Sequence, residues 1–140
     1  MFSALDISTS ALVAQRARLN AISSNLANVS TTRNEAGELE PYQPRFTVFR
    51  TDTDVRSPEG AAGVEVASVE IAAREPRYKW QPGHPDAIQQ GPHKGYVAFP
   101  DINLVQESVD ALEATRAYEA NVGVIEITKN LNQTTLRILA

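Results

Sequence analysis

Cysteine is absent from this 140-residue sequence, which excludes disulfide bonds, thiol catalysis and cysteine metal sites. Aromatic residues make up only 6% of the chain, so any core is predicted to be mainly aliphatic. Basic residues are outnumbered, with 13 Lys and Arg against 17 Asp and Glu, and no run of five or six like charges occurs. Because binding to nucleic acid needs a basic face, the composition argues against a nucleic-acid partner.

Long apolar runs are missing as well. No stretch approaches the roughly 20 apolar residues that a membrane-spanning helix needs, so no direct membrane insertion is expected. The first residues contain no basic side chain before Arg16 and no apolar stretch with a small-residue cleavage site. This is not the pattern of a secretory signal peptide. If the protein acts outside the cytoplasm, we expect it to leave without a cleaved signal peptide.

Signatures of catalysis are scarce. His84 and His93 both lie in a loop rich in Pro and Gly, where an ordinary turn is the stronger interpretation and metal ligation the weaker one. Glu35, Glu38 and Glu40 have the chemistry of a glycosidase acid and base, but their setting favours a solvated turn. Neither a nucleophile elbow nor a phosphate-binding glycine loop is present. The sequence therefore predicts a non-enzymatic protein without cofactor or metal.

Proline and glycine are absent from most of both ends of the chain. All eight prolines fall within residues 41–100, and six of the seven glycines fall within residues 37–95. These residues are disfavoured inside helices, so the distribution predicts an α+β fold. We expect long N- and C-terminal helices that form a coiled-coil-like helical layer, with a small β-rich middle unit. The predicted units are an N-terminal amphipathic helix over residues 1–32, a β-rich middle unit with Pro and Gly loops over residues 33–100, and a C-terminal amphipathic helix over residues 101–140.

The first helix is predicted to begin near Ser3, which has Asp6 at capping-box spacing, and to end near Asn28. Leucine recurs every seven residues along it, and this heptad pattern favours packing on a partner helix. The leucines are Leu5, Leu12, Leu19 and Leu26. The alternative is a helix on a membrane surface, which usually has a polar face rich in Lys and Arg. Here that face has only Arg16 and Arg18.

The last helix is predicted to begin after Asn103, an N-cap residue with Gln106 three positions later, and to continue for about 35 residues. It has two adjacent apolar rows, and such a helix needs more than one neighbour. Part of its apolar surface is therefore expected to contact another molecule. Gly123 is either a tolerated glycine or a point of close approach between helices.

The middle of the chain predicts four short strands in one small β unit. They cover residues 46–49, 64–71, 77–80 and 96–99, with a bulge near Ala67 where the alternation changes phase. Residues 51–63 and 82–95 are predicted to be loops. Tyr78 and Trp80 alternate with charged residues, which favours a place in the core over a ligand-stacking role.

Two short motifs near opposite ends resemble those of one family. Asn25-Leu-Ala-Asn28 resembles the motif that ends the N-terminal helix of flagellar axial proteins, the rod, hook and related subunits. Tyr118-Glu-Ala-Asn-Val122 is similar to the Tyr-x-Ala-Asn-Val motif of the same family. Residues 82–87 and 95–103 are similar to a stretch found in one of the short rod proteins, although Asp101-Ile102 replaces the usual Asn-Val.

The resemblance implies a structural subunit of the proximal rod of the bacterial flagellar basal body, built into a helical tube that transmits torque. It also implies partners: further copies of the chain, the rod proteins FlgB, FlgF, FlgG and FliE, and the flagellar type III export apparatus. The expected location is the periplasmic rod, reached by export without a cleaved signal peptide. The alternatives are another short rod subunit resembling FlgB, or a cytoplasmic coiled-coil adaptor or regulator.

The residues expected at subunit interfaces all lie in the two terminal helices. Three of them are asparagines, at positions 25, 28 and 121, which are expected to donate and accept side-chain hydrogen bonds at helix ends or between subunits. The full set is Leu5, Leu12, Leu19, Ile22, Asn25, Leu26, Asn28, Tyr118, Asn121, Val122, Val124, Ile127, Leu131 and Ile138.

Overall fold

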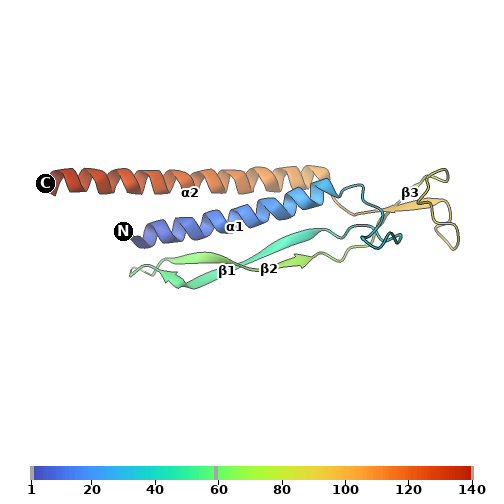
Figure 1. Cartoon of the computed structure of the whole chain (residues 1–140), viewed down its shortest axis with the longest axis horizontal. Coiled ribbons are helices and arrows are strands. Elements are labelled where there is room, and N and C mark those ends of the chain that lie inside the picture. The colour runs from blue at the N-terminus through green and yellow to red at the C-terminus, as the bar shows by residue number, and fades with distance from the viewer. Residues whose placement is uncertain (1, 59, 140) are drawn as a thin grey trace.

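Two long antiparallel helices form one side of the molecule, and two small sheets lie beside and beyond them (Figure 1). The computed structural model describes residues 2–58 and 60–139. The start of α1 and the end of α2 lie at the same end of the molecule, where α2 extends past α1 (Figure 1). The predicted α+β class with two long terminal helices is confirmed. In chain order the elements are α1 (Phe2–Ala27), β1 (Arg45–Arg56), β2 (Ala62–Ile71), β3 (Arg77–Trp80), β4 (Tyr96–Phe99) and α2 (Leu104–Leu139).

The helix ends follow local signals in the sequence. α1 contains neither Pro nor Gly, begins one residue before Ser3 and ends within one residue of the predicted Asn28. The Ser3 side chain, expected as a cap, lies outside the described part of the structure. At the start of α2 the predicted N-cap is confirmed. The side-chain Oδ1 of Asn103 accepts hydrogen bonds from the backbone amides two and three positions later, at 3.1 and 3.3 Å.

Strands β1 and β2 form an antiparallel hairpin with the predicted bulge. Val48 pairs with Ser68, but Phe49 pairs with Val66, so Ala67 is the additional residue. The prediction that residues 51–63 form a loop was wrong, because β1 continues to Arg56 and β2 begins at Ala62. This part of β1 is rich in Thr and Asp and has little apolar alternation. A strand that is solvated on much of its surface gives no such alternation.

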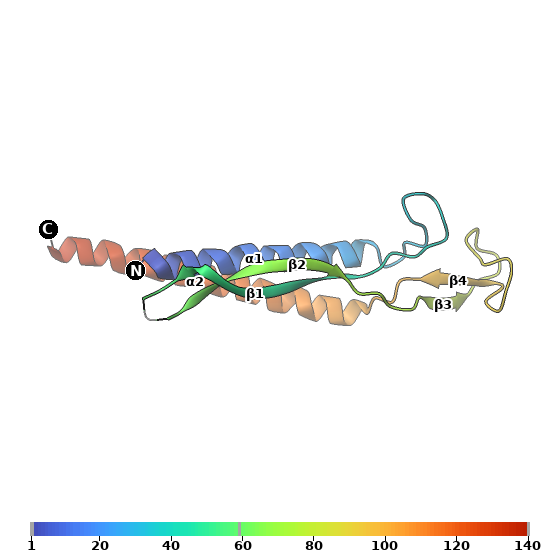
Figure 2. The same cartoon turned by 90° about the horizontal axis from the view of Figure 1, so that it is seen from below.

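The hairpin lies along α1, as both views show (Figures 1 and 2). Ser10 of α1 accepts a hydrogen bond through its hydroxyl from the backbone amide of Val64, at 3.0 Å. The contact is close because Gly63 has no side chain: a Cβ there would lie 2.8 Å from the Ser10 hydroxyl oxygen. The helix and the hairpin thus approach each other through small residues.

Strands β3 and β4 form a second, separate antiparallel sheet beyond the ends of the helices (Figure 2). The register joins Arg77 to Phe99 and Trp80 to Tyr96. All four predicted strands are therefore present, but they do not form one β unit. They divide into a hairpin against α1 and a distal sheet, because residues 72–76 carry the chain away from the first sheet.

The interior of the molecule is thin. Its buried apolar residues are mostly alanines, and Val97 is the only large side chain among the described residues that is fully buried. The chain exposes 9556 Å², whereas a compact monomer of 15.3 kDa exposes about 7,150 Å². This elongated shape leaves extensive surface available for contact with other molecules. Within residues 2–58 and 60–139, no helix is both long and apolar enough to span a bilayer.

Candidate assembly interface

α2 presents an exposed apolar stripe on the side away from α1. Within each half of the stripe, residues 105–112 and 124–138, the members are three, four or seven residues apart, so each half lies along one face of the helix. The twelve residues from Leu112 to Val124 make about three and a third turns, so the second half is turned around the helix relative to the first. Exposure reaches 72% at Val105 and 62% at Ile127. Arg116 interrupts the row near its middle. We call this surface the α2 outer stripe; it consists of Val105, Val109, Leu112, Val124, Ile127, Leu131 and Ile138.

The opposite face of α2 packs on α1. Ala114 is completely buried there, and it lies two positions from Leu112, so the two side chains point to nearly opposite sides of the helix. Arg18 of α1 reaches across and forms ion pairs with Asp110, at 3.0 Å, and with Glu113, at 3.5 Å. The helix pair is thus fixed by one face of α2, which leaves the outer stripe free.

The structure divides the predicted interface residues into an inward and an outward group. In α1, Ile22 and Asn25 are buried within the chain, and the heptad leucines and Asn28 are half-buried. In α2, Asn121 and Val122 are half-buried. The outward group belongs to α2 and comprises Tyr118, Val124, Ile127, Leu131 and Ile138. The contact of any of these residues with another subunit stays a prediction.

Three stripe residues were absent from the predicted interface. Val105, Val109 and Leu112 are all more than half exposed, and they continue the row of Val124 and Ile127 beyond Arg116. Their three- and four-residue spacing was the available signal. The row shifts around the helix at Arg116, and only its second half was included in the predicted interface.

Asn25 is the polar centre of the packing between α1, β1 and α2. It is 3% exposed, yet its side-chain amide is fully paired. Its Nδ2 donates to the Arg45 carbonyl oxygen at 2.9 Å and to Glu107 Oε2 at 3.2 Å. Its Oδ1 accepts from the Arg45 amide at 2.8 Å and from the Tyr42 hydroxyl at 3.2 Å. One side chain therefore links three segments of the chain.

The other two asparagines of the motifs form local hydrogen bonds. Asn28 donates to the Ser24 carbonyl oxygen at 2.9 Å and accepts from the Thr31 hydroxyl at 3.0 Å, so it lies at the end of α1 as expected. Asn121 lies in the middle of α2 and donates to the Ala117 carbonyl oxygen at 2.8 Å. Its single described bond is within the helix.

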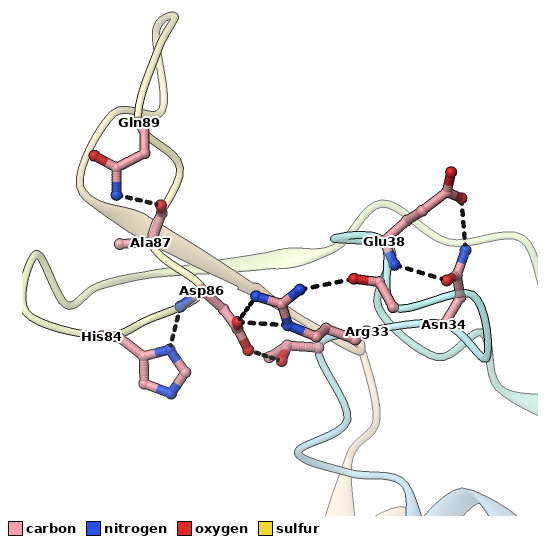
Figure 3. Close-up of polar contacts among 9 residues, drawn as sticks. Arg33, Asn34, Glu38, His84, Asp86, Ala87 and Gln89 are labelled. Carbon is pink, nitrogen blue, oxygen red and sulfur yellow. Dashed lines mark hydrogen bonds and ion pairs between the residues drawn. The ribbon is translucent and has the colours of Figure 1, made fainter.

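A polar cluster connects the segment after α1 to the loop before β4 (Figure 3). Arg33 donates through Nε to Asp86 Oδ1 at 2.7 Å and through Nη1 to the Gly37 carbonyl oxygen at 2.7 Å. The Thr32 hydroxyl donates to Asp86 Oδ2 at 2.6 Å. Both carboxylate oxygens of Asp86 are therefore engaged. We call the contacts of Thr32 and Arg33 with Asp86 the clasp, and it joins the segment after α1 to the loop between β3 and β4.

The two histidines have structural contacts. His84 Nδ1 accepts a hydrogen bond from the Asp86 backbone amide at 3.0 Å. The ring of His93 stacks on Tyr78, with ring centroids 4.0 Å apart. Within residues 2–58 and 60–139, no group of three His, Asp or Glu side chains is arranged to hold a metal ion.

The prediction that Tyr78 and Trp80 belong to the core was wrong. They are 43% and 59% exposed, respectively. The core side of the sheet holds Val97, which pairs with Lys79 between the two aromatic positions. A two-stranded sheet at the end of the molecule has one face without a covering layer, and the aromatic rings lie there.

We expect the clasp to be sensitive to acid. The pKa of Asp86 is lowered mainly by the hydrogen bond from Thr32 and then by the one from Arg33. Because its pKa in the folded chain is below the unfolded value, the clasp stabilises the fold above about pH 4 and loses this effect as the pH falls through the lowered pKa. In the Thr32→Val variant, NMR titration of the Asp86 carboxyl carbon should show a pKa closer to the ordinary value.

Thr53→Val is the matched control for this titration, because Thr53 is exposed on β1 and does not contact Asp86. It should leave the Asp86 titration unchanged. An unaltered Asp86 pKa in Thr32→Val would contradict the assigned cause.

Comparisons with known proteins agree with this architecture. Family models match both ends of the chain: "Flagella basal body rod protein" over residues 5–33 and "Flagellar basal body rod FlgEFG protein C-terminal" over residues 93–138. Flagellar basal-body rod protein FlgC of Borreliella burgdorferi is 39% identical, over 99% of this chain and 97% of its own. FlgC of Salmonella typhimurium is 36% identical over 95% of this chain and 93% of its own. FlgC of Bacillus subtilis is 34% identical over 98% of this chain and 97% of its own. The chain therefore belongs to the FlgC family of flagellar basal-body rod proteins.

Proposed function

We propose that this chain is a structural subunit of the proximal rod of the bacterial flagellar basal body. It assembles through the outward faces of its terminal helices into a helical tube. The observation that carries this proposal is the α2 outer stripe, a row of exposed apolar residues along most of a 36-residue helix. Exposed apolar surface of this extent marks an interaction site.

The dimensions of the helices support lateral assembly. α2 has 36 residues and α1 has 26, so about 15 Å of α2 has no counterpart in α1. The unmatched end includes Leu131 and Ile138 of the stripe. A neighbouring copy that covers this end would be staggered along the tube. Torque applied to one subunit would then pass to several others through helix contacts.

The partners that fit this role are further copies of the chain and the other rod proteins FlgB, FlgF, FlgG and FliE. Delivery by the flagellar type III export apparatus to the periplasmic part of the rod belongs to the same proposal. Catalysis forms no part of it. Its support is the antiparallel helix pair and the family to which the chain belongs.

The proposal is tested by location. An epitope tag inserted between Ser57 and Gly60, at the tip of the hairpin, leaves both helices unaltered. We expect the tagged chain to co-purify with detergent-extracted basal bodies, and electron microscopy should find it in the rod. A chain recovered only from the cytosol, with rods intact, would overturn the proposal in favour of the cytoplasmic adaptor.

A further inference from the structure

The distal sheet has few contacts with the rest of the chain. No Cα atom of β3 or β4 lies within 8 Å of one in α1, α2, β1 or β2. We call residues 77–99 the distal unit, and the two helices with the hairpin the body. Among the described residues, all side-chain and backbone hydrogen bonds between the distal unit and other parts of the chain are made by Asp86. The clasp therefore supplies the polar contact between the distal unit and the body.

Two short segments connect the distal unit to the body covalently. Residues 72–76 lead from β2 into β3, and residues 100–103 lead from β4 into α2. Neither segment belongs to a helix or a strand. Arg74 of the first segment forms an ion pair with Asp101 of the second, with 4.0 Å between Nη1 and Oδ2, so the two connections lie next to each other. Two neighbouring connections of a few residues each form a hinge about which a unit can turn as a rigid body.

Apolar packing between the distal unit and the end of α1 is incomplete. Val29 and Ser30, directly after α1, border a hollow of about 340 Å³ whose other walls include Arg77 and Phe99 of the distal sheet. Well-packed protein interiors contain few voids larger than a water molecule. At this place the distal unit and the body are therefore separated by open space rather than by interlocked side chains, and apolar contact does little to fix the position of the sheet.

The clasp is a directional contact that is ordered from both sides. On the side of the body, Arg33 donates to Asp86 and also to the Gly37 carbonyl oxygen, as Figure 3 shows for Arg33 and Asp86. On the distal side, the backbone amide of Asp86 donates to His84 Nδ1 at 3.0 Å, which orders the loop that carries the carboxylate. Thr32 binds the second carboxylate oxygen. Hydrogen bonds to a charged group are shorter and stronger than neutral ones, so the closed clasp favours a single orientation of the distal unit.

We propose that the distal unit is a hinged element whose orientation relative to the body is set by the clasp. With the clasp closed, the unit holds one position. When the contacts of Asp86 are lost, the unit turns about residues 72–76 and 100–103, while the helix pair and the hairpin keep their structure. The hinge is a property of the single chain and does not depend on the proposed assembly. In a rod, it would let the distal unit adjust to neighbours of different shape without disturbing the helix contacts.

Distance measurements on the purified full-length chain test the hinge. The sequence contains no cysteine, so two introduced cysteines can carry nitroxide labels without background labelling. Asn20→Cys on α1 and Lys94→Cys beside β4 are at exposed positions, and pulsed electron paramagnetic resonance measures the distance between their labels. We expect one narrow distance distribution while the clasp is intact. Thr32→Val with Arg33→Met removes the clasp from the side of the body and should at least double the width of this distribution.

The controls separate a hinge from general loosening of the fold. Thr53→Val with Arg16→Met makes the same two changes at exposed positions outside the clasp and should leave the width unchanged. A reference pair of labels, Asn20→Cys with Thr51→Cys, joins α1 to the hairpin and should keep its width when the clasp is removed. Asp86→Ala removes the clasp from the distal side and should broaden the first pair as well. An unchanged width in both clasp variants, a broad distribution with the clasp intact, or equal broadening of the reference pair would overturn the hinge.

Discussion

Cells that carry Ile127→Asp should form at least tenfold fewer rods and lose swimming motility, while the purified chain stays folded. Ile127 is 62% exposed in the monomer, so the substitution removes little internal contact. In the assembly, burial of such a side chain contributes about 1.5–3 kcal/mol, and an unpaired carboxylate in its place adds a desolvation cost of similar or greater size. A loss of about 3 kcal/mol weakens each contact more than 100-fold.

Gln133→Asp is the matched control. Gln133 is exposed on the same part of α2 and lies two positions from Leu131, which places it off the outer stripe. It adds the same charge without removing apolar surface. Basal bodies counted by electron microscopy should be normal in this strain. Normal rods in Ile127→Asp as well would show that the α2 outer stripe makes no subunit contact.

The second large effect is expected at Asn25, within the chain. Asn25→Ala removes the four hydrogen bonds of a side chain that is 3% exposed. It leaves the Arg45 amide and carbonyl without their side-chain partner at a part-buried contact. Loss of a partner from buried polar groups costs about 1–3 kcal/mol for each group. We expect the free energy of unfolding to fall by about 3 kcal/mol and the Tm by roughly 10 °C.

Thermal unfolding followed by circular dichroism measures this effect. Asn20→Ala is the control, since Asn20 is exposed on the same helix and makes no side-chain hydrogen bond to a described residue. It should change the free energy of unfolding by less than about 0.5 kcal/mol. Equal Tm values for the two variants would mean that the Asn25 contacts do not stabilise the fold.

Local signals in the sequence predicted much of the fold. The cap at Asn103, the bulge at Ala67 and the helix ends depend on neighbouring residues, and such features can be inferred from sequence alone. Thr51 to Arg56 could not be recognised as strand, because it is held by the backbone of β2 rather than by an apolar face of its own. Pairing between distant segments leaves little trace in local periodicity.

The candidate interface was predicted less completely, for a related reason. The heptad leucines of α1 were expected to face another helix, yet the most deeply buried positions of α1 are small or polar, such as Ser8, Ala14 and Asn25. Close packing of a helix against a hairpin requires small side chains. Small and polar residues add little to a hydrophobicity pattern, so the pattern did not predict that these positions are buried. Tyr78 and Trp80 were assigned to a core because the pattern could not show that the sheet has only two strands.

The thin interior has a consequence for the life of the chain before assembly. Stability gained by binding a neighbour follows mass action, so a subunit with few internal contacts depends on the concentration of its partners. We expect a lone copy to open more often than an assembled one and to be cleaved faster by proteases. The cell would thus degrade copies that are not assembled and keep those built into rods. The amount of the chain in the cell would then follow the number of rods.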